Sequence, residues 1–322
     1  MSGSTPARTV CVMSMRLLVA GTALVGLAGL TVLTGCRTFS ENFSDTRTES
    51  ASINEVRIQG SSGSVQIEPG SATQIDRTVY YQDRKPTART DRVEGHVLIL
   101  DTTCQPRQCS IDYRVTVPSS VKITGRLDSG RIDVRGVTTA TLSTDSGRIS
   151  VSHATGDVTA TTDSGRIDAS DIKGRVNLQS DSGSVHASGV GGALVVQTDS
   201  GSVRADGLAG AQTTVRTESG SVAATADSEQ DVKVTTDSGS IELTVPKGGA
   251  FRVRTHSDSG STHVNIPEAA SGGHLIDLSS DSGSIRVNEG DNAPVAPPAS
   301  PPSPAGSASP AASAAASPSP SA

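Results

Sequence analysis

The chain has 322 residues, a formal charge of −6, 2% aromatic residues, no Trp and 33 Gly. This composition argues against one large globular core, because few bulky side chains are present to fill it. The charge is spread along the sequence, which argues against nucleic-acid binding, since phosphate recognition needs a concentrated basic surface.

Residues 1–36 are predicted to be a lipoprotein signal peptide. Arg8 and Arg16 precede an apolar stretch at residues 17–33. The end of this stretch overlaps the sequence Leu33-Thr34-Gly35-Cys36. These four residues resemble the bacterial lipobox, in which the cysteine becomes a lipidated N-terminus. We therefore expect Cys36 to carry lipid and to anchor the protein on the outer face of the cytoplasmic membrane. An uncleaved membrane anchor and an ordinary secretory signal are the alternatives, since a short apolar stretch suits all three.

The next two segments differ in composition. Residues 37–50 are mostly polar and are predicted to be a tether between the lipid and the folded domain. Residues 51–120 do not follow the later repeat and are predicted to be a β-rich cap region, with first coils and a cover for the sheet end. The strands expected there are residues 55–59, 64–68, 74–81, 96–101 and 111–117.

Two cysteines of this region are predicted to form a disulfide. Cys104 and Cys109 lie between two alternating segments, residues 93–103 and 110–117, so the bridge is expected to close a hairpin loop. Disulfides persist outside the cytoplasm, where the lipobox places the protein. A metal or redox pair fits less well, because no His neighbours the motif and four residues separate the cysteines.

Residues 121–290 are dominated by a short repeat. Asp-Ser-Gly, once as Glu-Ser-Gly, occurs nine times at steps of 17 to 19 residues, then 21 and 23, and in eight copies Ile or Val stands two positions after the Gly. Counted from this Gly, apolar residues fall at −7, −5, +2 and +4, which is typical of two short strands on either side of a turn. The repeat therefore predicts an all-β fold, a single-stranded parallel β-solenoid with coils of about 18 residues.

The interior of this solenoid is predicted to be narrow. Position +4 is often a small residue, as at Ala169, Ala187, Ala205 and Ala224. Small inward residues leave no room for a ligand between the strands, so any binding is expected on the outside. The predicted outward residues Thr159, Thr161, Thr213 and Thr235 would form a hydroxyl array that could bind ice or a polysaccharide, but ordinary β-propensity on a solvated face is the favoured explanation.

In-register stacking would place the acidic residues of the turns along one edge. Carboxylates about 4.8 Å apart repel one another, and Arg131, Arg148 and Arg166 are expected to share the charge of the first three. The others are expected to be turn-capping, because Asp-x-Gly is an ordinary Asx-turn composition; calcium is the alternative, but the glycine run of calcium-binding β-rolls is missing. No metal site and no cofactor are predicted. The turn residues are Asp128, Asp145, Asp163, Asp181, Asp199, Glu218, Asp237, Asp258 and Asp281.

Catalysis is not expected. Glycan-active β-helix enzymes need paired carboxylates and aromatic platforms, whereas Phe251 is the only aromatic residue of the repeat region. His256 and His263 flank the turn with Asp258 and Ser259, so a Ser/His/Asp site can be drawn. A solvated turn is favoured, because Asp and Ser occur at this corner in nearly every copy.

Residues 291–322 are predicted to be a disordered tail. The segment is rich in Pro, Ala and Ser, has nine of the sixteen Pro residues and has no charge beyond Asp291.

Taken together, the lipobox, the strand from Tyr113 to Pro118 and the tandem Asp-Ser-Gly-[Arg/Ser]-[Ile/Val] units resemble a bacterial β-strand-repeat family of adhesin type, common as lipoproteins in actinobacteria and of unknown function. The resemblance covers residues 51–290 and implies a surface β-solenoid. We therefore expect a non-enzymatic cell-surface protein, with a membrane contact through its lipid, that presents an outer face to an envelope polymer or protein. The alternatives are a structural spacer, an envelope-stress accessory protein and, less favoured, a glycan-active enzyme.

Overall fold

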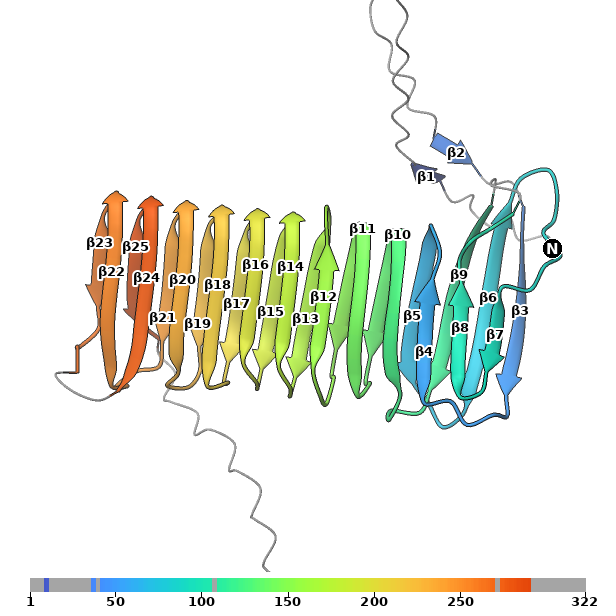
Figure 1. The fold of residues 1–322 in the computed structure, drawn as a ribbon, viewed down its shortest axis with the longest axis horizontal. Helices are drawn as coiled ribbons and strands as arrows, with labels where there is room; N and C mark the ends of the chain where they lie inside the picture. Colours follow the sequence, from blue (N-terminus) through green and yellow to red (C-terminus); the bar gives the residue numbers. More distant parts are fainter. Residues whose placement is uncertain (1–8, 12–35, 39–40, 106–108, 270–272, 291–322) are drawn as a thin grey trace, which may run out of the picture.

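The computed structural model describes residues 9–11, 36–38, 41–105, 109–269 and 273–290. These residues form a long rod of stacked strands, as Figure 1 shows, which confirms the prediction of an all-β parallel solenoid. A separate antiparallel pair joins β1 (Thr9–Cys11) and β2 (Cys36–Thr38). Among the described residues, no helix is long and apolar enough to cross a membrane. The apolar stretch at 17–33 and the tail at 291–322 lie outside these residues.

A typical coil consists of two strands joined by the Asp-Ser-Gly turn. β12 (Val158–Thr162) leads into the turn and β13 (Arg166–Ile172) leads out of it. β12 pairs in parallel with a strand of the next coil, and so does β13, so the first strands form one sheet and the second strands form another. In β10 (Lys122–Arg135) and β11 (Thr139–Ser152) the strand continues through the turn.

The following coils have the same plan. They are β14 (Val176–Ser182) with β15 (Ser184–Val190), β16 (Leu194–Ser200) with β17 (Val203–Leu208), β18 (Gln212–Ser219) with β19 (Val222–Ala226), and β20 (Asp231–Ser238) with β21 (Ile241–Val245). Neighbouring coils align turn on turn: Gly130 pairs with Gly147, and Ser200 with Ser219. Repeat positions therefore become straight rows along the rod.

The core lies between the two sheets and follows the repeat. Val176, Leu178, Val185 and Ala187 of one coil are all buried, as are their equivalents in the neighbouring coils. The period-two pattern thus buries one side of each strand and exposes the other. The small residues at +4, Ala169, Ala187, Ala205 and Ala224, are buried and face this core, as the pattern predicted.

Two N-terminal coils precede the repeats, and their order in space differs from their order in sequence. β4 (Glu55–Gln59) and β5 (Gly63–Pro69) stack on β10, and β8 (Val97–Asp101) and β9 (Cys109–Val117) stack outside them. Cys104 and Cys109 form the predicted disulfide. The predicted hairpin is wrong, because β8 pairs with β4 and β9 with β5, so the bridge closes a coil corner. Alternation in a sequence does not distinguish a corner from a hairpin turn.

Antiparallel strands cover the N-terminal end of the rod. β6 (Thr73–Tyr81) pairs with β9, β3 (Glu41–Glu49) pairs with β6, and β7 (Asp91–Glu94) pairs with β8. The prediction of a tether is therefore wrong for residues 41–49. The strand is hard to detect because its half-buried side is mostly charged: Asp45 binds Arg77 at 2.6 Å and Arg47 binds Asp91 at 2.9 Å.

The last two coils exchange places. β22 (Phe251–Ser259) and β23 (Thr262–Asn265) come first in the chain, and β24 (His274–Ser282) and β25 (Ile285–Glu289) come last. In space β24 pairs with β20 on one side and β22 on the other, and β25 lies likewise between β21 and β23. Figure 1 shows the final coil seated between the two that precede it. The longer repeat steps of 21 and 23 residues hold the connections that this exchange requires.

Candidate functional site

The acidic turn residues form a row along one edge of the rod. Because the coils stack in register, successive acids are separated by about 4.8 Å, and Asp281 lies between Asp237 and Asp258. Asp145 is half-buried and the other eight are exposed. Within the described part of the chain two of them form ion pairs, Asp145 with Arg126 at 2.6 Å and Asp258 with His256 at 2.9 Å.

The three arginines that were expected to balance the first turn acids contact other carboxylates. Arg131 lies 3.9 Å from Asp133, and Arg148 and Arg166 lie 3.9 and 3.7 Å from Asp168. Residues two apart in a strand share a face, so Arg131 and Arg166 reach the acid of their own strand rather than the turn acid. Arg148 reaches Asp168 of the neighbouring coil, which pairs in register with Ser150. The prediction that these arginines balance the turn carboxylates is therefore wrong.

The turn glycines are required by the stack itself. A Cβ atom added to Gly201 would lie 1.8 Å from the carbonyl oxygen of Gly183. The glycines of the opposite corner are as crowded, since a Cβ on Gly210 would lie 1.9 Å from the carbonyl oxygen of Gly192. Close backbone approach between coils, rather than an unusual φ, therefore explains most of these glycines.

A row of buried hydroxyls lies just inside the turns, at position −3, and was not predicted. Ser257 donates a hydrogen bond to the carbonyl of Gly283 at 2.9 Å, and Ser280 donates to that of Gly239 at 3.0 Å. Thr144 donates to Thr162 at 3.1 Å. The sequence contains the signal, because position −3 is Ser or Thr in every copy after the first. Ser257 and Ser280 thus support the turn backbone from within, whereas Ser180, Thr198 and Thr217 of the same row are buried without a hydrogen-bond partner in the described chain.

The outer side of the first sheet is uncharged over its middle coils. Two rows of in-register hydroxyl and amide side chains run along β11, β12 and β14, and all are exposed or half-buried. One row continues to Gln197 of β16, whereas the other meets Val195 there. Gln179 and Gln197 join neighbouring coils through a 2.9 Å hydrogen bond. We call this surface the amide–hydroxyl face: Thr141, Ser143, Thr159, Thr161, Asn177, Gln179 and Gln197.

One predicted member of the hydroxyl array points the other way. Thr213 is 1% exposed and donates a hydrogen bond to Gln230 at 2.8 Å. It stands at position −7 of its copy, which faces the core, so the repeat itself assigns it to the interior. Thr159, Thr161 and Thr235 are half-buried on the outer side, as predicted.

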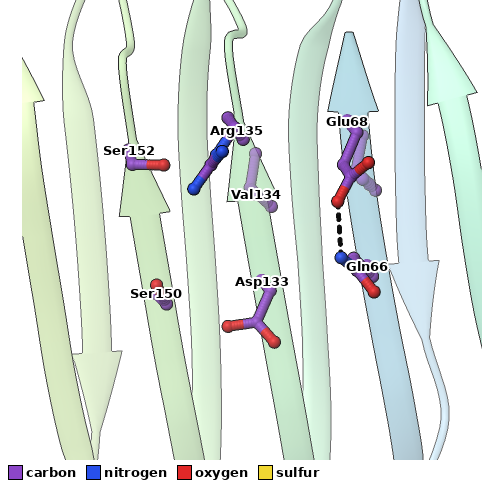
Figure 2. Close-up of a pocket in the computed structure, with 8 residues that line it drawn as sticks. Gln66, Glu68, Asp133, Val134, Arg135, Ser150 and Ser152 are labelled. Carbon is purple, nitrogen blue, oxygen red and sulfur yellow. Dashed lines mark hydrogen bonds between the residues drawn. The ribbon is translucent and has the colours of Figure 1, made fainter.

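The outer side of the second sheet is charged and carries a shallow groove. Figure 2 shows Gln66 and Glu68 of β5, Asp133 and Arg135 of β10, and serines of β11 around the groove. The volume of the groove is about 200 Å³. Partial burial raises the pKa of Asp133 above its ordinary value, and the charges of Arg131 and Arg148 oppose this only in part. The groove is small and open compared with typical ligand pockets.

The two histidines of the hypothetical Ser/His/Asp site are not brought together. His256 lies on β22 and His263 on β23, which belong to different sheets, and both point to solvent on opposite sides of the rod. His256 contacts Asp258. The described residues contain no group of three His, Cys, Asp or Glu side chains suited to a metal ion.

Comparison with known protein families decides the classification. Residues 113–288, more than half of the chain, match the Toastrack DUF4097 family. The chain belongs to the Toastrack DUF4097 family. The matched residues begin in β9 and end in β25, and residues 41–112 lie outside the match. No curated protein matches the chain.

Three solved structures match more distantly. A cell adhesion protein of Clostridium sporogenes, described as "putative", is 8% identical with a TM-score of 0.21, covering 78% of this chain and all of that one. A "putative adhesin" of Bacteroides fragilis is 13% identical with a TM-score of 0.30, covering 77% and 97%. A "putative adhesin" of Parabacteroides distasonis is 11% identical with a TM-score of 0.26, covering 76% and 97%.

Proposed function

We propose that this Toastrack protein is a non-enzymatic, lipid-anchored surface protein whose rod presents the amide–hydroxyl face to a neutral, hydroxyl-rich polymer of the cell envelope. The contrast between the two outer sides supports this proposal. The amide–hydroxyl face has seven uncharged hydrogen-bonding side chains in two rows, whereas the second sheet carries Arg131, Asp133, Arg148 and Asp168 at comparable positions.

The face is also rigid and repetitive. Each side chain is mounted on a strand paired on both sides, and the same chemistry recurs about every 4.8 Å along the rod. A polymer with regularly spaced hydroxyl groups could form many weak hydrogen bonds to such an array, with little ordering of the protein on binding. An anionic polymer suits the rod less well, because the chain is acidic and a row of carboxylates follows its edge.

The test is retention of the full chain on purified envelope polymer. Replacing Gln179 and Gln197 together by Lys places bulky charges on the amide–hydroxyl face and is expected to reduce retention at least tenfold. The matched control replaces Ser202 and Ser221 by Lys, since these exposed residues lie on neighbouring coils at the edge of the second sheet. Equal retention of both variants, or no retention of the unaltered chain, would contradict the proposed face.

A structural spacer is the second candidate, because a uniform in-register stack makes a rod whose length is set by the number of coils. Deleting residues 176–193 removes one coil and shortens the rod by about 4.8 Å. If the protein is a spacer, its function is lost in the shortened rod and kept when Gln179 and Gln197 are replaced by Lys. If it is a binding protein, its function is kept in the shortened rod and lost in the Lys variant.

A further inference from the structure

The two ends of the rod are finished differently. At the N-terminal end β3, β6 and β7 add antiparallel strands beyond the last coil. At the C-terminal end β22 and β23 are outermost, and the added contact is a single bridge from Glu268 to Phe251. The remaining edges of both strands, residues 252–259 and 262–265, have no strand beside them within the described chain. Figure 1 shows this end at the left of the rod.

The core is incompletely covered at this end. Val253 and Val264 are half-buried, whereas their in-register neighbours one coil inward, Ile276 and Val287, are 0% exposed. Ile266 is half-buried beside them. Two open strand edges with an apolar strip between them are an aggregation hazard unless they are covered.

We propose that a second copy of this chain covers this end, in a two-fold symmetric end-to-end dimer that continues both sheets. Only a structure with two strand edges at the same spacing can pair with β22 and β23 at once, and this end of another copy has that spacing by identity. Head-to-tail stacking is blocked, because β3 and β7 occupy the other end. An isologous contact of this kind closes after two copies.

The backbone defines the register of this contact. The carbonyl of Phe251 points outward, where it accepts a hydrogen bond from Ala269 at 2.8 Å, so alternation also turns the backbone groups of Val253, Thr255 and Ser257 outward. The carbonyl oxygen of Ser261 points inward, where it accepts a hydrogen bond from the amide of Ile285 at 2.9 Å. By alternation, the backbone N–H and C=O groups of Val264 therefore point outward. Counted from the turn, Thr255 and Val264 are each the second inward position, so we infer that they stand at equivalent heights on the two sheets. One two-fold axis can therefore pair each with its own copy.

The charges agree with this register. When Thr255 faces the partner copy's Thr255, Arg252 lies opposite Asp258 of the partner copy, twice in the dimer. In the core strip, Val264 meets its own copy and Val253 meets Ser257. The pairing thus extends the apolar interior across the contact and places opposite charges on its surface.

The chain's own tail is a poorer cover. Residues 291–322 follow β25, which belongs to the inner of the last two coils, and nine of them are Pro, which lacks the N–H that a strand must donate. A strand from an unrelated protein would cover one edge and leave the other open.

Cysteine pairs test the contact in the full chain, held in its membrane or in detergent. Arg254 lies opposite His256 of the partner copy at a position where antiparallel Cα atoms are about 4.5 Å apart, which is within disulfide range. Arg254→Cys with His256→Cys is therefore expected to give a covalent dimer on oxidation. Thr214→Cys with Arg216→Cys occupies the same two rows in the middle of the rod and should give none, and the unaltered chain shows the background.

Sedimentation in detergent tests the hydrogen bonds and charges. Thr255→Pro with Val264→Pro removes outward N–H groups and leaves those that bond to β24 and β25, so the chain should stay folded by circular dichroism and dissociate at least tenfold more readily. Asp258→Arg should weaken the dimer, and Arg252→Asp in the same chain should restore it. A full chain that sediments as a monomer would overturn the proposal. If it dimerises only after residues 291–322 are removed, the tail covers this end of the rod. If it crosslinks to another protein instead, that protein covers the end.

Discussion

Ser238 of β20 pairs in register with Ser282 of β24, although Ser259 of β22 follows sooner in the chain. The chain thus moves one coil ahead, returns and fills the space that it left. The strands that come last in the sequence become interior members of the stack, with neighbours on both sides, and an earlier coil becomes the end of the rod.

This exchange predicts an unusual pattern of hydrogen exchange. The amides of β24 bond within the stack, whereas half of those in β22 face outward or pair only across the proposed dimer contact. Residues 276–280 should therefore exchange more slowly than residues 253–257 when the chain is kept monomeric by Thr255→Pro and Val264→Pro. Faster exchange of the C-terminal β24, as simple fraying from the chain end would give, would argue against the inserted position.

The same geometry predicts the cost of core truncations. Leu278→Ala should lower the free energy of unfolding by about 2–5 kcal/mol, because Leu278 is 0% exposed in an interior coil. Val253→Ala should have a clearly smaller effect, since Val253 is half-buried at the end. Urea unfolding of the two variants measures the difference, and equal losses would contradict the assignment of β22 to the rod end.

A turn glycine should be intolerant of a methyl group. Gly201→Ala would place its Cβ 1.8 Å from the carbonyl of Gly183, so neighbouring coils must separate. We expect a loss of at least about 2 kcal/mol in unfolding free energy, against a change within about 0.5 kcal/mol for the exposed control Ser202→Ala. A stable Gly201→Ala protein would mean that the coils are not in backbone contact at this corner.

The row of turn acids should destabilise the rod at low ionic strength. Asp181→Asn with Asp199→Asn removes two neighbouring charges, so the melting temperature should rise at low salt and approach that of the unaltered chain at 1 M salt. Asp206→Asn is the control, since Asp206 is paired with Arg204 at 2.7 Å and its removal should not stabilise. If the Asp181 and Asp199 variant is instead less stable, these carboxylates are held by a cation or a turn hydrogen bond.

Tyr113 should couple stability to alkaline pH. Burial is the main cause that raises the pKa of its hydroxyl far above the ordinary value, and the hydroxyl lies 2.6 Å from that of Thr90. Above about pH 10 the unfolded chain loses this proton while the folded chain keeps it, so the unfolding free energy falls as pH rises. Tyr113→Phe should flatten this fall between pH 9 and 11 in urea titrations, and an unchanged slope would show that other groups cause it.

The repeat positions explain why so much of the rod could be predicted. Because period-two patterning and a fixed step define a coil, the sequence alone assigns Val176, Leu178, Val185 and Ala187 to the core. The same rule places Thr213 inside, and the outward assignment failed because it followed residue type instead of position. The predicted arginine contacts were wrong because Asp128 is close to Arg131 in sequence but not on the same face, whereas alternation along the strand directs Arg131 to Asp133.

The order of the last coils in space could not be predicted from the sequence. β22 and β24 carry the same pattern and could each pair with β20, so local preference does not distinguish the two arrangements. The choice depends on how residues 246–250 and 266–273 connect the coils, which is a property of the whole stack. The sequence did predict that Thr159 and Thr161 of the amide–hydroxyl face point outward, but the amide members Asn177, Gln179 and Gln197 join them only through the register of separate coils.

Disulfide trapping between turn serines tests the stacking order most directly. With β24 seated between β20 and β22, Ser238→Cys with Ser282→Cys joins adjacent coils about 4.8 Å apart and should form a bridge without lowering the melting temperature. Ser238→Cys with Ser259→Cys joins coils about 9.6 Å apart and should remain reduced. Bridging of the second pair and not the first would show that the coils follow the order of the sequence.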